Sequence, residues 1–220
     1  MLDRFRAFWT KVFTPVVDTL LRWGVSPDAV TLVGTAGVCA GALVFFPRGE
    51  LLVGVLVITA FVFSDLVDGA MARKSGRVSP FGAFLDSTLD RLGDAAIFGG
   101  LAMYYVGPGD DDWLAALALY CLTMGSVTSY ARARAEALGM QAKVGIAERA
   151  DRLVAILVVT GLADLVNRLG AGEDALWAIP VTLGLLAVAS TVTVVQRILV
   201  VRTQAKALER PAGQAGQEAP

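Results

Sequence analysis

The stretch ALWAIPVTLGLLAVASTVTVVQ at residues 175–196 contains no charged side chain and is the longest apolar run of the chain. A helix needs about 20 such residues to cross the hydrocarbon core of a bilayer. The rest of the chain is similarly apolar: 55% of its 220 residues are hydrophobic, 18% are charged, and the mean hydropathy is +0.62. Soluble proteins carry about 25% charged residues. The composition therefore predicts an integral membrane protein.

Five further segments toward the N-terminus are predicted to span the membrane. One apolar run, Ala95–Val106, is too short by itself and spans only if its helix begins near Phe84. That helix would then carry three aspartates inside it. The six predicted spans are Ala29–Phe46, Leu51 to about Arg73, Phe84–Val106, Trp113–Ala131, Glu148–Ala163 and Ala175–Gln196. We expect an all-α integral membrane protein with six transmembrane helices in a domain over residues 25–202.

The distribution of charge supports this count. With six spans, both termini and the loops after the second and fourth spans lie on one side of the membrane. All of the 19 Lys and Arg residues except Arg48 and Arg168 fall on that side. The positive-inside rule therefore places both termini in the cytoplasm. We expect a multi-pass protein of the cell membrane whose active site faces the cytoplasm.

The two ends of the chain differ from the spans. Residues 1–24 repeat apolar side chains at helical spacing and include Trp9 and Trp23. This pattern predicts an amphipathic helix in the cytoplasmic interface, and the alternative is a helix packed against the bundle. Residues 203–220 are rich in Lys, Glu, Gln, Gly and Pro, which predicts a disordered cytoplasmic tail.

The residue types also exclude several classes of site. The chain has no histidine, which excludes a Ser-His-Asp triad, a Cys-His dyad and a His-ligated zinc centre. Cys39 and Cys121 each lie in an apolar run and predict neither a metal cluster nor a disulfide framework. Nucleic-acid binding fits so apolar a chain poorly.

Four aspartates in the second and third spans are the strongest functional signal. Asp65 and Asp68 lie three residues apart, and Asp86 and Asp90 lie four apart, so each pair shares one helical face. A charge within the membrane costs at least about 2.5–3.5 kcal/mol and usually marks a functional site. Simple ion pairing would account for only one or two of these acids. The arginines available for it are Arg73, Arg91 and Arg152.

Four facing carboxylates would form a hard-oxygen site that suits Mg²⁺ or Mn²⁺, and their charge favours two ions. A phosphate-bearing ligand would complete the coordination. Gly69 and Gly82 flank the aspartates and leave space for a ligand to approach the helix backbone. The alternative for such glycines is close helix packing in the membrane.

The segments DLVDGAMAR (residues 65–73) and GAFLDSTLD (residues 82–90) match D-x2-D-G-x2-A-R-x8-G-x3-D-x3-D at all eight defined positions. This pattern resembles the signature of the CDP-alcohol phosphotransferase family. Further segments are similar to those of the actinobacterial phosphatidylinositol phosphate synthases within that family. They are PDAVT (27–31), SYARARAE (129–136), ERADR (148–152) and VQR (195–197). The resemblance implies transfer of the phosphatidyl group of CDP-diacylglycerol to an alcohol, with release of CMP.

The resemblance also implies roles for individual residues. Two divalent ions, Mg²⁺ or Mn²⁺, would be held by Asp65, Asp68, Asp86 and Asp90, and Asp90 would also act as the general base. The residues implied for CDP-diacylglycerol are Asp28, Ala29, Val30, Thr31, Gly69, Arg73 and Ser79. Those implied for the acceptor phosphate are Ser129, Arg132, Arg134, Arg152 and Arg197. At Arg132 we expect lysine in the relatives.

The arginines favour a phosphorylated acceptor, because the guanidinium fork matches phosphate. The resemblance implies 1D-myo-inositol 3-phosphate. A glycerol 3-phosphate acceptor, arginines that bind only anionic lipid headgroups, and an ion-coupled transporter are the alternatives. Against transport, the acids and arginines gather at one side of the membrane. The implied partners are CDP-diacylglycerol, inositol phosphate, membrane lipids and, by resemblance, a second copy of the chain in a homodimer.

Overall fold

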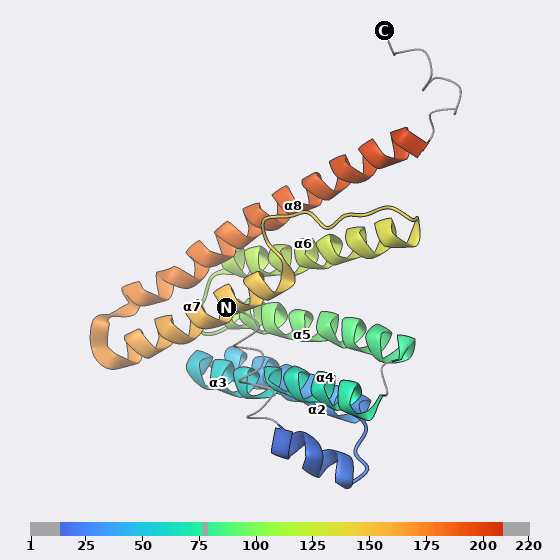
Figure 1. Cartoon of the computed structure of the whole chain (residues 1–220). Helices are drawn as coiled ribbons and strands as arrows, with labels where there is room; N and C mark the ends of the chain where they lie inside the picture. Colours follow the sequence, from blue (N-terminus) through green and yellow to red (C-terminus); the bar gives the residue numbers. More distant parts are fainter. Residues whose placement is uncertain (1–13, 77–78, 209–220) are drawn as a thin grey trace.

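The structure, a computed structural model, describes residues 14–76 and 79–208, which form a bundle of helices without strands (Figure 1). The α-helices are a short one over residues 14–22, α2 (Pro27–Ala40), α3 (Leu51–Val62), α4 (Ser64–Ser75), α5 (Pro80–Val106), α6 (Asp112–Ala137), α7 (Arg149–Val166) and α8 (Ala178–Leu208). Short π or 3-10 segments extend two of these helices or precede the last one. They are Gly41–Phe45, Phe46–Arg48, Asn167–Ala171 and Glu173–Trp177.

Polar caps fix the helix ends near the signature residues. Ser26 begins α2 and Ser79 begins α5, and each side chain accepts a hydrogen bond from a backbone N–H of the first turn, at 3.2 and 2.9 Å. A proline follows each cap, as is common at the first position of a helix. Glu148 and Asp151 form a capping box at the start of α7. Gly76, with a φ of 66°, ends α4.

Helix α5 occupies the middle of the bundle. It packs on α6 on one side and on α2 on the other, α6 packs on α8, and α3 packs on α7 (Figure 1). The core between these helices is apolar, and its fully buried side chains include Phe46, Ile58, Leu101, Ile156 and Leu183. This arrangement places the starts of α2 and α5 and the second half of the Leu51–Ser75 segment together.

Five helical segments of the described chain are long and apolar enough to cross a membrane. They are Pro27–Arg48, Leu51–Ser75, Asp112–Ala137, Arg149–Gly170 and Asp174–Leu208. The remaining predicted span, Phe84–Val106, lies in α5. This helix has 27 residues and is about 40 Å long at 1.5 Å per residue, but it carries four charged residues, which are Asp86, Asp90, Arg91 and Asp94. It begins at Pro80 rather than near Phe84 because Ser79 caps it.

The start predicted for the disordered tail is wrong. Helix α8 continues to Leu208, so residues 203–208 are helical. Gln204 explains the extension, since its side chain accepts a hydrogen bond from the Gln141 N–H at 2.9 Å and donates one to the Gln141 carbonyl at 2.6 Å. The remainder of the predicted tail, residues 209–220, lies outside the described residues.

The helix over residues 14–22 packs against α4. Val17 is buried in a small cluster with Val67 and Met71, and Lys74 forms an ion pair with Asp18. This part of the N-terminal segment therefore contacts the bundle. Residues 1–13 lie outside the described residues, so the interfacial position of residues 1–24 stays a prediction.

Candidate active site

A cavity of about 340 Å³ opens between α2, α4 and the start of α5. Its lining residues are Pro27, Asp28, Thr31, Asp68, Gly69, Ala72, Arg73, Ser79, Gly82, Ala83 and Asp86. The cavity thus brings together both halves of the signature and the PDAVT segment, which are far apart in sequence. Most of the residues predicted to contact CDP-diacylglycerol line it. Ala29 and Val30 lie in the same turn of α2 without lining it.

Two glycines of the signature lie in the cavity wall close to its polar side chains. A Cβ at Gly82 would lie 3.3 Å from Ser79 Oγ and 3.6 Å from Asp28 Oδ1, and a Cβ at Gly69 would lie 3.3 Å from Arg73 Nη1. A methyl group at either position would press against these side chains, and a larger side chain would extend into the cavity. The two glycines therefore leave space beside Asp28, Arg73 and Ser79.

Asp68 is held in a fixed orientation. Its side chain is 8% exposed, and its Oδ2 accepts a hydrogen bond from Thr31 Oγ1 at 2.6 Å. Thr31 is itself buried and also donates to the Pro27 carbonyl at 3.2 Å. Charge-assisted hydrogen bonds of this length are strong. The PDAVT segment therefore positions a signature carboxylate, in addition to lining the cavity.

The carboxylates of the signature act on one another. Asp86 and Asp90 both repel the negative charge of Asp68, and a cation would relieve this repulsion. Oxygen donors of this kind fit a hard divalent ion. Among the described side chains, no three carboxylates or thiols are already grouped as a metal centre. Asp65 lies one turn before Asp68 on α4, and its side chain lies outside what the structure describes.

Asp90 points to the start of α7. Its Oδ1 lies 3.0 Å from Arg149 Nη1, and its backbone carbonyl accepts a hydrogen bond from Arg149 Nη2 at 3.3 Å. The Nε of the same arginine donates to Asp94 Oδ1 at 2.9 Å. Arg91 Nε lies 3.5 Å from the other oxygen of Asp94. Arg91 and Arg149 thus both contact the carboxylates of Asp90 and Asp94.

Two of the arginines predicted for the acceptor are buried. Arg152 and Arg197 are 3% and 4% exposed, and their charges act on each other. Their hydrogen bonds go to backbone carbonyls, those of Ala147, Val144 and Thr128. Neither forms an ion pair with a carboxylate of the described chain. Asp94 acts on the charge of Arg152, and Glu148 and Glu136 act on that of Arg197, from beyond ion-pair distance. A buried charge without a directly paired counter-ion is costly, so this pair is suited to an anionic ligand.

The other predicted acceptor residues come from the last turns of α6. Ser129 Oγ donates to the Gly125 carbonyl at 3.2 Å, and Arg132 forms an ion pair with Glu136 at 3.0 Å. The charge of Arg132 also acts on Arg197. Arg134 is exposed near the end of the helix. Arg132 and Arg152 are thus each close enough to Arg197 for their positive charges to repel it. Arg134 is more exposed than these three residues.

The chain matches the model of the CDP-alcohol phosphatidyltransferase family over residues 24–203. It belongs to that family. The chain is therefore a CDP-alcohol phosphatidyltransferase, and the resemblance drawn from the signature is confirmed.

Individual relatives of this phosphatidyltransferase are also similar over nearly the whole chain. A phosphatidylinositol phosphate synthase of Streptomyces avermitilis is 55% identical over 207 residues, which cover 93% of this chain and 84% of the relative. One of Cutibacterium acnes is 52% identical over 208 residues, covering 92% and 98%. The crystal structure of the Mycobacterium tuberculosis phosphatidylinositol phosphate synthase with CDP-DAG bound has a TM-score of 0.83 and 42% identity, covering 92% and 99%. A structure of the same enzyme with manganese and citrate has a TM-score of 0.82 at 42% identity, covering 90% and 93%.

Sequence reasoning about this phosphatidyltransferase missed two residues. Asp94 continues the spacing of four that relates Asp86 to Asp90, and it is buried, at 5% exposure. That spacing was the available signal. Arg149 stands inside the ERADR segment, but its side chain contacts α5, 55 to 59 residues earlier in the chain. No local pattern indicates such a contact.

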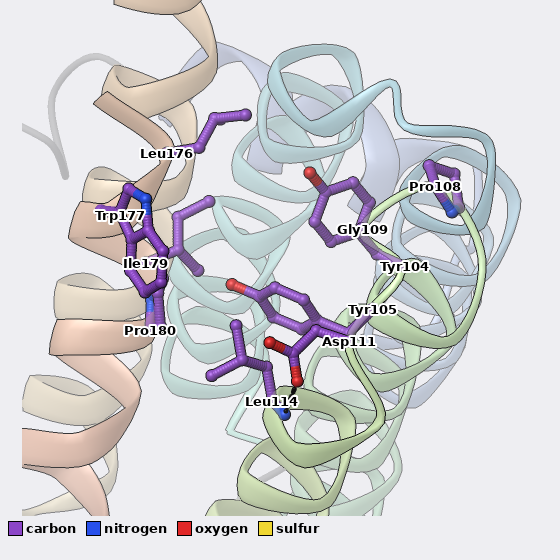
Figure 2. A pocket seen from close by; sticks show the side chains of 10 residues that line it. All are labelled: Tyr104, Tyr105, Pro108, Gly109, Asp111, Leu114, Leu176, Trp177, Ile179 and Pro180. Atoms are coloured by element: carbon purple, nitrogen blue, oxygen red, sulfur yellow. Dashed lines mark hydrogen bonds between the residues drawn. The ribbon is translucent and has the colours of Figure 1, made fainter. Parts of the chain in front are cut away.

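A second cavity, of about 290 Å³, lies at the opposite end of α5. Figure 2 shows the hydroxyl groups of Tyr104 and Tyr105 directed into it, with Asp111 beside them and Trp177 on the far side. Asp111 caps α6 through a 3.0 Å hydrogen bond from the Leu114 N–H. None of the predicted site residues lines this cavity, whereas several of them line the cavity at the signature end.

Proposed function

We propose that this phosphatidyltransferase transfers the phosphatidyl group of CDP-diacylglycerol to 1D-myo-inositol 3-phosphate and releases CMP. The observation that carries the proposal is the buried pair Arg152 and Arg197. Their hydrogen bonds go to backbone carbonyls, and neither forms an ion pair with a carboxylate of the described residues. Such a pair favours an acceptor that carries its own phosphate over a neutral alcohol. The names of the similar relatives from Streptomyces and Cutibacterium support the same acceptor.

The donor would bind in the cavity between α2, α4 and α5. Arg73 and the start of α2 would contact its polar part, and Gly69 and Gly82 would let it approach the helix backbones. The similarity to the Mycobacterium tuberculosis enzyme with CDP-DAG bound supports this placement. The acyl chains would remain in the bilayer, because the cavity is at the edge of the apolar helices.

Asp65, Asp68, Asp86 and Asp90 would hold two divalent ions, Mg²⁺ or Mn²⁺, which supply charge neutralisation for the pyrophosphate and the departing CMP. The manganese complex of the similar Mycobacterium tuberculosis enzyme supports a divalent ion. Thr31 would keep Asp68 oriented through its 2.6 Å hydrogen bond. Asp90 would accept the proton of the attacking hydroxyl. Since aspartate is a weak base, correct placement contributes more than basicity.

The membrane arrangement is part of the proposal. We propose that α5 also spans the cell membrane, which gives six spans in all, with Asp86 and Asp90 near the cytoplasmic end of the helix. Both termini and the cavity would then face the cytoplasm. The segregation of basic residues supports this orientation. The helix over residues 14–22 would lie at the same interface. The homodimer implied by resemblance stays a prediction, checked by the mass of the purified protein in detergent.

The proposed function is tested with the purified full chain in lipid–detergent micelles. CMP release from CDP-diacylglycerol is measured with inositol 3-phosphate, glycerol 3-phosphate, free inositol and serine as acceptors, each with Mg²⁺ and Mn²⁺. We expect release with inositol 3-phosphate and little with the two unphosphorylated acceptors. Release with glycerol 3-phosphate alone would assign the other phosphorylated acceptor. Release with none of the acceptors would contradict the proposed reaction.

A further inference from the structure

The guanidinium of Arg149 contacts three acceptors on α5. Nη1 lies 3.0 Å from Asp90 Oδ1, Nη2 lies 3.3 Å from the Asp90 carbonyl, and Nε lies 2.9 Å from Asp94 Oδ1. These contacts use the rigid fork of the arginine side chain. They fix the rotation of the Asp90 side chain and the backbone turn that carries it. A lysine has a single ammonium and reproduces only part of this geometry.

Asp94 keeps the guanidinium in place. Its side chain is 8% exposed, against 29% for Arg149 and 25% for Asp90, so it is the most deeply buried member of the group. Its second oxygen faces Arg91 Nε at 3.5 Å. Partly buried charged contacts are screened less by water than surface pairs. Asp94 therefore fixes the position of the Arg149 guanidinium, and Arg149 in turn fixes the position of Asp90.

This arrangement engages the two oxygens of Asp90 differently. Oδ1 is held by Arg149 at 3.0 Å, whereas the contact of Oδ2 with Arg91 Nη2 is 4.0 Å, at the outer limit of an ion pair. Arg149 therefore holds Asp90 through Oδ1 and through the backbone carbonyl of the same residue. Such a hold on both the side chain and its backbone suits a carboxylate that must meet an acceptor hydroxyl in one orientation.

The contact does not arise from extensive packing between the helices. Helix α7 packs mainly on α3 and α8, and α5 packs on α6 and α2. Arg149 bridges between them from the first position of α7, which the Glu148–Asp151 capping box fixes. Arg152 follows one turn later on the same helix. The start of α7 therefore carries both the contact to Asp90 and a residue of the proposed acceptor pocket.

We propose that Arg149 is a positioning residue, which holds the Asp90 carboxylate in the orientation that the acceptor hydroxyl requires, and that Asp94 anchors Arg149. This inference rests on the proposed function, in which Asp90 is the base. A misplacement of a reacting group by about 1 Å can lower a rate by about 100-fold. Loss of the arginine should therefore lower turnover and leave the binding of both substrates nearly unchanged.

The test compares the wild type with Arg149→Ala, Arg149→Lys and the control Arg168→Ala. Arg168 is a matched control because it contacts a buried aspartate, Asp164, at 3.0 Å through Nε, at the other end of the α7 segment. Initial rates of CMP release are measured while CDP-diacylglycerol and the acceptor are varied separately, and thermal unfolding is followed for each variant. Loss of a hydrogen bond to a charged group predicts a fall in kcat of roughly 10- to 150-fold for Arg149→Ala.

Both KM values of Arg149→Ala should stay within about threefold of wild type, Arg149→Lys should be intermediate, and Arg168→Ala should keep the wild-type kcat. A kcat within threefold of wild type would overturn the proposal. So would a raised acceptor KM at unchanged kcat, which would place Arg149 in the acceptor pocket, or an equal loss in Arg168→Ala. If Arg149→Ala does not fold, Arg149→Lys and Asp94→Asn give the same comparison of kcat with KM. If the wild type uses glycerol 3-phosphate and not inositol phosphate, the proposed acceptor fails, and the Arg149 comparison is made with glycerol 3-phosphate.

Discussion

Two clusters of charged side chains lie at the two ends of the α7 segment, one around Arg149 and the other around Arg168, about 28 Å apart along the helix. They differ in how many of their charged groups are paired within the protein. At one end, Asp164 Oδ2 accepts from the Leu52 N–H at 2.8 Å and from Arg168 Nε at 3.0 Å, and Arg168 Nη2 also reaches Glu50 at 2.8 Å. This cluster ties the start of α3 to the end of α7. Its groups satisfy one another.

The signature end leaves more of its charged groups without an ion pair. Asp90 and Asp94 pair with Arg149, but Asp68 and Asp86 line an open cavity. Arg152 and Arg197 form hydrogen bonds with backbone carbonyls and no ion pair within the described residues. This contrast is what we expect between a structural cluster and a site whose remaining partners are substrates and ions.

The largest effect should come from Asp68→Asn compared with Asp164→Asn. Both residues are buried aspartates, at 8% and 5% exposure. Asp68→Asn should lower kcat more than 100-fold, roughly the effect of losing more than 3 kcal/mol of charge interaction, and should weaken activation by Mg²⁺. Its unfolding temperature should be unchanged or higher, because one repelling charge is removed.

Asp164→Asn should show the reverse pattern, with wild-type kcat and a lower unfolding temperature, because Arg168 loses the more deeply buried of its two charged partners and keeps only Glu50. Rates and thermal unfolding of the two variants decide the matter. Activity of Asp68→Asn within a few-fold of wild type would show that this carboxylate does not take part in the chemistry.

Asp90→Asn should have the next largest effect. Removal of a general base typically lowers kcat by about 10²- to 10⁴-fold. The amide keeps an oxygen that can accept from Arg149, so the fold and the donor cavity should be retained. Binding of CDP-diacylglycerol, measured by titration of the purified variant, should stay within about threefold of wild type. A loss of donor affinity at unchanged turnover would show that Asp90 binds substrate and is not the base.

Arg152→Ala tests whether the buried arginines bind the acceptor. If Arg152 and Arg197 bind a phosphate, the variant should raise the acceptor KM by roughly 10- to 150-fold. The KM for CDP-diacylglycerol should change far less, because that substrate contacts a different cavity. The matched variant Arg168→Ala should change neither KM. Effects of Arg152→Ala that follow the anionic lipid content of the micelles, or equal changes in both KM values, would indicate headgroup binding instead.

The sequence predicts the parts of this site that depend on local spacing. Asp68 and Asp86 line one cavity, as their motif implies. The caps at Ser26 and Ser79 were not predicted, and α5 begins at Pro80 and not near Phe84. Tertiary contacts are a different matter. Arg91 was among the arginines predicted to pair with the aspartates, and it does contact Asp94. The main partner of Asp90 and Asp94, however, is Arg149. Its contact depends on where the start of α7 comes to lie, which local spacing does not encode.

The extent of α8 shows the same limit. Its last residues have a polar composition that predicts a disordered tail, yet a tertiary contact between Gln204 and Gln141 holds them in the helix. Composition cannot anticipate a partner 63 residues away. The arginine pocket was predicted by resemblance, whereas the burial of Arg152 and Arg197 and their carbonyl partners became apparent only from the packing of α6, α7 and α8.

The smallest effect should come from the two helix caps, Ser79 and Asp111. Each accepts a hydrogen bond from the first turn of its helix, at 2.9 and 3.0 Å, and each substitution by alanine should cost about 1 kcal/mol of stability. Only Ser79 lines the donor cavity. Ser79→Ala should therefore also raise the KM for CDP-diacylglycerol by roughly 2- to 10-fold, the effect of one ordinary hydrogen bond, and Asp111→Ala should leave it unchanged. Thermal unfolding and donor titrations of both variants measure the two effects. An equal rise in KM for both would mean that donor binding responds to general loosening of the bundle, and Ser79 would then be a cap without a contact to the substrate.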